Sequence, residues 1–527
     1  MSLAVAVDRT ILVSEPRPYE PIEATARRFP RAIGLKGAAI ALLLVAVVAR
    51  WRTFGNPVIH IDEQFYWLVG GRILHGALPY VDIWDRKPIG LFLLYGLFHM
   101  FGTVLAYQIG ALACVWGTAL LLFAMGRRIA PPAGALAGAI LYVLYLNLAG
   151  GEGGQAPVFY NLPVAGAIAL IFFNRRRAEA NGGDLRLIGA GTMLLFGIAL
   201  QIKYSVVFEG LFAGVALLWF AWRGGRPIGR LAIDALLWVS CALAPTILSA
   251  AVYAKLGYIH EWWFANATSI LLRKPELPEM VRERIEVMAM LMVPLVLSVP
   301  LRRWTGSRSV DPGVRDDLRF LDGWAAAALM GMVLFGSWFN HYALPLFAPF
   351  SLIAAPLWNR RGGRAWMAIL LVSSGIWGQH VLYRHSITRG TGKTLAAAVE
   401  ATAGAKGCFF VYDGMPAFYE ATNSCFLTNH MFSAHLQSLN EIGATGIDQA
   451  QEVRRIMTHR PERVMTMEPA YDGENLAARA ELYRVLARDY RLLYYYDGGG
   501  HDFAVYGLNG TTPAAPPRIE TADRRFF

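Results

Sequence analysis

The stretch 60–90 places acids and bases close together in a pattern that can do chemistry. Its charged residues include Asp62, Glu63, Asp82, Asp85, Arg86 and Lys87. A partly dehydrated carboxylate beside basic groups is the arrangement that suits a general base. A neighbouring lysine can neutralise the charge that develops on a phosphate leaving group. We therefore treat this stretch as a candidate site for proton transfer coupled to the departure of a phosphate.

Both key residues of the stretch also have ordinary explanations. Asp62 precedes the helix-like run "EQFYWLVGGRIL", so it can cap the N-terminus of a helix, where acids are favoured. Lys87 precedes an apolar run and can extend its ammonium group toward lipid phosphates. However, the loop that carries both residues, 51–103, is longer than an ordinary connection. The sequence leaves the capping and the catalytic interpretations open.

Further charged and polar residues stand near the ends of apolar runs. Lys203 in "QIKYS" lies between two such runs joined by almost no loop, and Glu209 follows in "VVFEGLF". Ionisable groups within spans usually face the protein interior or a cavity, although a structural Lys203–Glu209 pair is the alternative. Arg273 lies in a long loop and can hold anionic groups. His341 and Tyr342 in "WFNHYALPLFAP" stand at the mouth of a span, where anchoring at the interface is the alternative.

A largely apolar chain must position these residues. The 527 residues are 55% hydrophobic and 17% charged, whereas soluble domains carry about 25% charged residues. This composition predicts a multi-pass membrane protein. Apolar runs near the ~20 residues that a bilayer requires predict about eleven spans. They lie near 34–50, 104–126, 131–149, 158–173, 185–202, 205–222, 231–254, 286–301, 320–338, 343–358 and 365–381.

The run 89–101 decides the predicted topology. It is short for a span and suits a helix on the membrane surface. With this run on the surface, the arginine clusters that follow the other runs, such as 127–128 and 360–364, fall on the side of the N-terminus. The positive-inside rule places that side in the cytoplasm. We therefore predict a cytoplasmic segment 1–33, which is not a cleavable signal, and a transmembrane bundle 34–381 whose loop 51–103 lies outside. The same clusters account for the net charge of +11 without nucleic-acid binding.

The C-terminal part has the composition of a soluble domain. Strand-like runs begin near 408, 463, 491 and 502, and helical patterns cover 448–459 and 475–489. This alternation predicts an α/β domain over 382–510, outside the cytoplasm. The end, 511–527, is rich in proline and charge and is predicted to be disordered.

Two short motifs in the C-terminal part bear on its environment. Cys408 and Cys425 can form a disulfide in an oxidising compartment. The run "GTGKT", 390–394, lacks the first glycine of a phosphate-binding loop, and no strand precedes it. We assign it to a turn.

The first outer loop resembles that of a known family. The run "DEQFYWLVGGRILHGALPYVDIWDRKPIG", the "GRR" ending at Arg128, "HYALPLFAP" and the α/β tail are similar to the bacterial relatives of protein O-mannosyltransferases and of the lipid A aminoarabinose transferase. These are glycosyltransferases of the GT-C fold. The resemblance implies an enzyme of the bacterial inner membrane that moves a sugar from a polyprenyl-phosphate carrier to a lipid, glycan or protein acceptor on the outer face, with inversion at the anomeric carbon.

The resemblance also implies roles for individual residues. Asp62 would be the base, Glu63 its companion and Lys87 the contact to the carrier phosphate. We extend the phosphate site to Arg86, Lys203 and Arg273, and the substrate contacts to Tyr66, Tyr80, Asp85, Glu209, His260, His341 and Tyr342. The chain departs from the family at 64–66, where an arginine is frequent, and at Ile89, where a second proline is common. These departures leave the sugar and the acceptor open.

Other functions remain alternatives at this stage. We assign no metal ligands, since neither His-x-x-x-His nor Cys-x-x-Cys occurs; a requirement for Mg²⁺ or Mn²⁺ is left open. A transporter or flippase of a lipid-linked saccharide would use Lys203 and Glu209 as pathway residues, but inverted repeats are not visible. A non-catalytic envelope assembly protein would use the outer domain and would not need Asp62.

Overall fold

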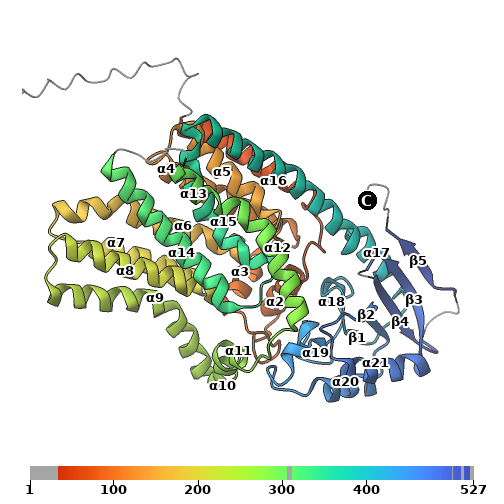
Figure 1. The fold of residues 1–527 in the computed structure, drawn as a ribbon. Coiled ribbons are helices and arrows are strands. Elements are labelled where there is room, and N and C mark those ends of the chain that lie inside the picture. Colours follow the sequence, from red (N-terminus) through yellow and green to blue (C-terminus); the bar gives the residue numbers. More distant parts are fainter. Residues whose placement is uncertain (1–33, 305–310, 501, 512–514, 523–527) are drawn as a thin grey trace, which may run out of the picture.

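The computed structural model describes residues 34–304, 311–500, 502–511 and 515–522. A bundle of long helices forms the N-terminal part, and a sheet with flanking helices forms the C-terminal part (Figure 1). The predicted cytoplasmic segment, 1–33, lies outside the described residues.

Seven of the described helical segments are long and apolar enough to cross a membrane. They comprise α4 (Leu105–Gly126), α6 (Ala156–Ala180), η1 (Tyr204–Val206) with α8 (Val207–Arg223), α9 (Ile228–Leu256), α12 (Pro278–Val296) with α13 (Ser298–Trp304), α14 (Pro312–Phe335), and α16 (Arg361–Thr388) with α17 (Gly392–Glu400). Large apolar side chains of α9, such as Leu236 and Leu248, face outward, as contact with lipid requires. The chain is therefore a multi-pass helical membrane protein.

The remaining predicted spans coincide with shorter helices. These are α1 (Leu35–Arg50), α5 (Pro132–Leu146), α7 (Arg186–Leu200) and α15 (Leu344–Ala354). α5 packs against α15 and α16, and α7 packs against α6 and α9. The prediction of about eleven apolar segments thus places the helices of the bundle, although only the seven segments above reach the length and apolarity of a complete span.

The first outer loop folds into a pair of packed helices. α2 (Ile61–Leu74) lies against α3 (Ile89–His99), which is the run predicted as a surface helix and has only 11 residues. The two helices approach most closely at Gly70 and Gly96. A Cβ atom at Gly70 would lie 2.7 Å from the backbone nitrogen of Gly96, so this close packing requires glycine. It fixes the start of α2 relative to the segment that precedes α3.

The C-terminal domain contains a mixed five-stranded sheet. Its order is β1-β2-β4-β3-β5, with β1 (Phe409–Val411), β2 (Arg463–Glu468), β3 (Tyr490–Asp497), β4 (Asp502–Leu508) and β5 (Arg518–Thr521). β4 is antiparallel to β2 and β3, whereas β1 is parallel to β2 and β5 to β3. α20 (Gln449–Thr458) and α21 (Leu476–Asp489) share a core with one face of the sheet. The four strands and two helices predicted here are confirmed.

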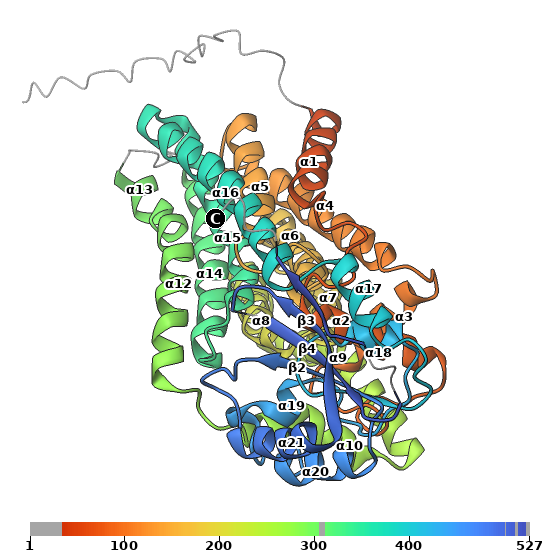
Figure 2. The same ribbon diagram turned by 90° about the vertical axis from the view of Figure 1, so that its right-hand side faces the viewer.

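The opposite face of the sheet packs against the bundle. Met465, Tyr494 and Phe503 belong to the same apolar core as the membrane helices. The hydroxyl of Tyr496 donates a hydrogen bond of 2.6 Å to the carbonyl of Ile387 in α16. Figure 2 shows the sheet in front of the bundle helices. The domain is therefore joined to the bundle by a shared core.

Three further predictions concern the C-terminal part. Cys408 and Cys425 form a disulfide, as predicted. The "GTGKT" run is a turn at Gly390, followed by Thr391 as the cap of α17. The prediction that 511–527 is disordered is wrong for Arg518–Thr521, which pairs with β3 as β5. The edge of β3 would otherwise leave unpaired backbone groups, and an added strand satisfies them.

Candidate active site

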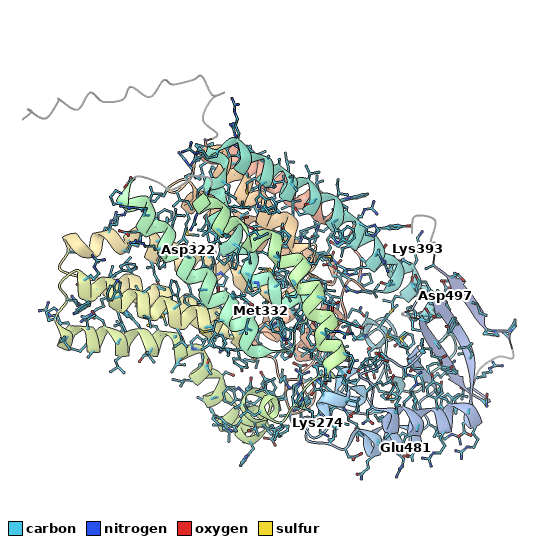
Figure 3. The ribbon with its side chains drawn as sticks, viewed as in Figure 1. Lys274, Asp322, Met332, Lys393, Glu481 and Asp497 are labelled. Atoms are coloured by element: carbon cyan, nitrogen blue, oxygen red, sulfur yellow. A yellow bond between two sulfur atoms is a disulfide. The ribbon has the colours of Figure 1, made fainter. Side chains whose placement is uncertain are left out.

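A cavity of about 1040 Å³ lies between the bundle and the C-terminal domain. Figure 3 labels two of its lining residues: Lys274 at the junction of the two parts, and Met332 on α14 within the bundle. Of the residues predicted from the sequence, nine line this cavity: Asp62, Asp85, Arg86, Lys87, Lys203, Glu209, Arg273, His341 and Tyr342. Glu63, Tyr66, Tyr80 and His260 do not. The cavity therefore defines the candidate site.

Asp62 lies at the start of α2 but does not cap it. The cap residue is His60, whose Nδ1 accepts the backbone N–H of Asp62 at 3.2 Å. The capping interpretation, one of the two that the sequence leaves open, is thus wrong for Asp62. As the second residue of α2, its carboxylate is still favoured by the helix dipole. Its Oδ2 accepts a hydrogen bond of 2.9 Å from Gln155. Burial would raise the pKa of Asp62, but attraction to His60 and Lys87 outweighs it and holds the pKa well below its usual range. Asp62 is therefore ionised.

Glu63 points away from the cavity. Its side chain is fully buried, and it packs against Gly153 in the connection between α5 and α6. Arg50, at the end of α1, donates to the carbonyls of Gly151 and Gly153 and holds this connection in place. Burial and the nearby Glu152 raise the pKa of Glu63 to about 8. The adjacent carboxyls thus differ in both position and charge.

The contact between Glu63 and Gly153 gives a testable prediction. An alanine Cβ at position 153 would lie 2.1 Å from Oε2 of Glu63, so Gly153→Ala is expected to destabilise the protein by about 1–3 kcal/mol. Thermal unfolding of the purified protein measures this effect. The matched control is Gly166→Ala, whose Cβ would meet its nearest neighbour, Leu195, at 3.6 Å. Equal melting temperatures for the two variants would contradict the packing described.

Lys87 is held in the cavity wall by its neighbours. Its backbone N–H donates to Oδ1 of Asp85 at 2.7 Å, and its carbonyl accepts the hydroxyl of Tyr80 at 2.9 Å. The ring of Tyr66 lies 5.9 Å from Nζ of Lys87. Tyr66 and Tyr80 therefore support Lys87 from behind the cavity wall. Within the described ranges, the ammonium group forms no ion pair.

Lys203 provides a second cation in the same cavity. It lies between α7 and η1, with Nζ 4.2 Å from the centre of the Tyr342 ring. Burial, with the charge of Lys87, lowers the pKa of Lys203 to about 7. The structural Lys203–Glu209 pair, the alternative to a functional role, is not formed, and the Glu209 carboxylate accepts a hydrogen bond of 2.6 Å from Trp324. Lys203 likewise has no ion pair among the residues that the structure describes.

The two arginines predicted at the phosphate site have partners. Arg86 forms a double hydrogen bond of 2.7 and 2.6 Å to the carboxylate of Glu441. Arg273 pairs with the same carboxylate at 2.9 Å. Because these guanidinium groups share Glu441, they join two outer loops to the C-terminal domain. Lys87 and Lys203 therefore remain cavity cations without an acidic partner at contact distance in the described chain, as does Lys274 at the junction of the two parts.

His260 is the predicted site residue farthest from the candidate chemistry. It lies exposed on α10 (Ile259–Trp263) and does not line the cavity. His341 and Tyr342 do line it, from η3 (Asn340–Ala343). The structure therefore does not bring His260 together with the other predicted site residues, and its role as a substrate contact stays a prediction.

The sequence interpretation missed an entire wall of the cavity. The C-terminal domain contributes Phe432, Ala434, His435, Gln437, Ser438, Asn440, Glu441, Tyr471 and Gly473. His435 lies 3.4 Å from Asp85 through its Nε2. No local pattern marks these residues, since their role depends on contacts between segments far apart in the chain. His60, in contrast, stands two residues before Asp62 and could have been found as a potential ligand or cap.

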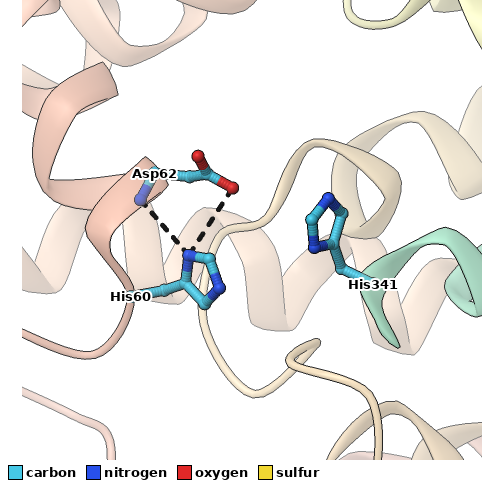
Figure 4. A group of neighbouring side chains, drawn as sticks. All are labelled: His60, Asp62 and His341. Atoms are coloured by element: carbon cyan, nitrogen blue, oxygen red, sulfur yellow. Dashed lines mark hydrogen bonds and ion pairs between the residues drawn. The ribbon is translucent and has the colours of Figure 1, made fainter. Parts of the chain in front are cut away.

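One group of side chains in the cavity has the composition of a metal site. His60, Asp62 and His341 each offer a ligand atom, and these atoms lie within 4.8 Å of one another. Figure 4 shows the His60 ring against the backbone and carboxylate of Asp62, with His341 facing them from a separate element. Among the described residues this is the one such group of three or more.

Comparison with known proteins identifies the fold. No protein-family model and no curated protein matches the chain. The crystal structure of ArnT from Cupriavidus metallidurans in the apo state matches with a TM-score of 0.58 at 12% identity, covering 91% of this chain and 99% of that one. ArnT bound to undecaprenyl phosphate matches with a TM-score of 0.57 at 11% identity, covering 92% and 100%. The chain thus has the GT-C membrane fold. That fold, as found in ArnT, is the one expected from the first outer loop.

Proposed function

We propose that the protein is a glycosyltransferase that moves a sugar from a polyprenyl-phosphate carrier to a lipid, glycan or protein acceptor. The observation that carries this proposal is the combination, in one cavity, of the ionised Asp62 with the ammonium groups of Lys87 and Lys203. One anionic and two cationic groups match the two tasks of the reaction, which are to take a proton and to hold a phosphate. The fold similarity to ArnT bound to undecaprenyl phosphate supports the same donor class.

The apolar part of the cavity supports a lipid carrier. Where the cavity runs along α12 and α14, its lining includes Met280, Val281, Ala328, Met332 and Phe335. Both helices belong to segments that can cross a membrane. A prenyl chain bound here would bury apolar surface, while its phosphate would lie at the polar end beside the two lysines. A soluble nucleotide donor would not use such a surface.

The proposed reaction needs one proton acceptor and one anion site. The acceptor hydroxyl lies against Asp62, and its oxygen attacks the anomeric carbon as the bond from that carbon to the phosphate oxygen breaks. The proton passes to the Asp62 carboxylate. The electron pair of the broken bond leaves with the polyprenyl phosphate, whose charge Lys87 and Lys203 stabilise. A single displacement inverts the anomeric configuration.

The proposed site faces the outside of the bacterial inner membrane, with the C-terminal domain on that side. The arginine clusters at the opposite ends of the spans support this orientation. The Cys408–Cys425 disulfide supports it as well, because disulfides persist in oxidising compartments. A lipid-linked donor fits this location, since nucleotide sugars stay in the cytoplasm.

The test is sugar transfer by the purified full-length protein. The protein is incubated in detergent or vesicles with polyprenyl-phosphate donors carrying radiolabelled sugars and with an extract of envelope lipids, glycans and proteins. We expect the label to move to an acceptor and free polyprenyl phosphate to appear in equal amount. Movement of intact donor across the vesicle membrane without transfer would instead establish a flippase. An absence of both activities with every donor would leave an assembly role as the better explanation.

The lowered pKa of Lys203 predicts a pH dependence for donor binding. A lysine with a pKa of about 7 in the free protein is largely neutral at pH 8. Lys203 must then take up a proton when the phosphate of the donor binds. The KM for the donor is therefore expected to rise above pH 7, by up to about tenfold per pH unit. Measuring KM from pH 6 to 9 checks this. Lys203→Arg should abolish the rise, because arginine stays charged throughout; an unchanged slope in that variant would exclude Lys203 as its cause.

A further inference from the structure

We propose that His60, Asp62 and His341 bind one divalent transition-metal ion in the wall of the cavity. All three residues line the cavity, and their ligand atoms lie within 4.8 Å of one another. They come from two elements far apart in the sequence, the start of α2 and η3. The spacing of His60 and Asp62 is compatible with a shared ion, but the third ligand comes from nearly the other end of the bundle, so the sequence alone does not show the complete group.

The spacing of the three ligands is close to what a metal requires. An ion about 2.1 Å from each ligand needs ligand atoms roughly 3–4 Å apart. The pair His60 Nδ1 and Asp62 Oδ2 is already 3.6 Å apart. The other separations are at most 4.8 Å, so the ligand atoms must move somewhat closer together when an ion binds. Figure 4 shows His341 on the side opposite His60 and Asp62, on a separate element.

The hydrogen bonds of the group leave the ligands in the form that binds metal. His60 Nδ1 accepts the N–H of Asp62, so it carries a lone pair and no proton. The amide Nε2 of Gln155 lies 2.8 Å from this nitrogen and 2.9 Å from Asp62 Oδ2. A donor group therefore occupies the position between nitrogen and carboxylate that a cation would take. Binding of a metal at Nδ1 requires rotation of the Gln155 amide and loss of the hydrogen bond from the Asp62 N–H, because this ring nitrogen has a single lone pair.

The backbone around the group keeps the ligands apart at a fixed distance. Gly150 lies between the two imidazoles, where an added Cβ would lie 3.9 Å from Cδ2 of His60 and 4.0 Å from Cβ of His341. Its φ of 78° is a conformation that glycine adopts without strain. Ligands held by a helix start, a short helix and this turn are largely positioned before the ion arrives.

The donor set selects the class of ion. Two imidazoles and one carboxylate favour Zn²⁺, Co²⁺, Mn²⁺ or Fe²⁺, whereas Mg²⁺ prefers oxygen ligands and retains water. Of the two ions left open by the sequence, Mn²⁺ therefore fits and Mg²⁺ does not. An ion bound here would add positive charge beside Asp62. Oδ1 of Asp62 would remain available to accept the proton of the acceptor hydroxyl. This role rests on the proposed function, but binding of the ion does not.

Metal content of the tag-free full-length protein tests the proposal. The protein is stripped with a chelator, equilibrated with Zn²⁺ or Co²⁺, freed of unbound ion and analysed for metal. We expect about one equivalent per chain in the wild type and about one tenth or less in His60→Ala and His341→Ala. His435→Ala, which removes a histidine from the opposite wall of the same cavity, is expected to retain the metal. Equal metal in all four proteins, or none in the wild type, would overturn the proposal.

A second measurement needs only the wild type and so does not depend on the folding of any variant. The Co²⁺-loaded protein is expected to show visible absorption that Zn²⁺ abolishes and a hundredfold excess of Mg²⁺ leaves intact. Loss of the absorption with Mg²⁺ would overturn the assignment of the ligands. These readouts are independent of sugar transfer. A metal-loaded protein without transferase activity would refute the proposed function alone, and a protein that transfers sugar but takes up no Zn²⁺ or Co²⁺ would refute the metal site alone.

Discussion

Replacing Asp62 by asparagine is expected to lower kcat for sugar transfer by about 10³-fold, because the amide cannot take the proton of the acceptor hydroxyl. Asparagine has nearly the same shape, so the start of α2 and its contact with Gln155 should persist. The change also removes a negative charge that is coupled to Lys87. The KM for the donor should therefore stay the same or fall. Steady-state kinetics with a labelled donor separates the two effects.

The matched control for this prediction is Asp82→Asn. Asp82 lies in the same outer loop, but it accepts a hydrogen bond from the backbone of Leu78 and does not line the cavity. Its replacement should leave kcat within a few-fold of the wild type. If Asp62→Asn is as active as this control, Asp62 is not the base, and the catalytic assignment fails even if the protein transfers sugar.

Lys87→Met is expected to lower kcat/KM for the donor by about 10²–10³-fold. Methionine keeps the unbranched stem that lies near Tyr66, but it removes the charge that opposes the leaving phosphate. Direct binding of polyprenyl phosphate, measured by calorimetry in detergent, should weaken in parallel. Polyprenyl phosphate is both the leaving group of the reaction and the ligand in the calorimetry. The kinetics and the binding measurement therefore report on the same phosphate site.

Lys393→Met serves as the control for the loss of a lysine charge. Lys393 is exposed on α17 and lies outside the cavity, as Figure 3 shows. Its replacement should change neither polyprenyl phosphate binding nor kcat/KM. If Lys87→Met and Lys393→Met bind polyprenyl phosphate equally well, the phosphate lies elsewhere in the cavity, and Lys203 becomes the better candidate.

The sequence predicts the elements of this protein better than their contacts. Apolar runs locate the bundle helices because every segment that crosses a lipid bilayer must itself be apolar, whatever it packs against. Strand-like runs such as 463–468 are likewise local signals, and β2 coincides with that run. The run 89–101 coincides with α3, whose 11 residues are short for a span, and its place on the membrane surface stays a prediction.

The site was predictable only where a residue's type is unusual for its place. Lys203 and Asp62 attract attention because charges beside spans are rare, and both line the cavity. Glu441 sits among ordinary polar residues, and its partner Arg86 is 355 positions away in the chain. His60 is the N-cap of α2, although aspartate has the higher intrinsic preference for an N-cap position. Such pairings depend on how the domain packs against the bundle, which local patterns do not encode.

The shared carboxylate of Glu441 has a consequence for how the protein is made. Arg86 reaches the membrane early in synthesis, Arg273 later, and Glu441 only after the last span has been inserted. Until then, the two arginines have no common partner, and one side of the cavity is missing. The bundle helices can therefore assemble while the ribosome is still working, but the cavity gains its last wall only when the C-terminal domain packs against them. A nascent chain thus lacks a complete cavity until its synthesis ends.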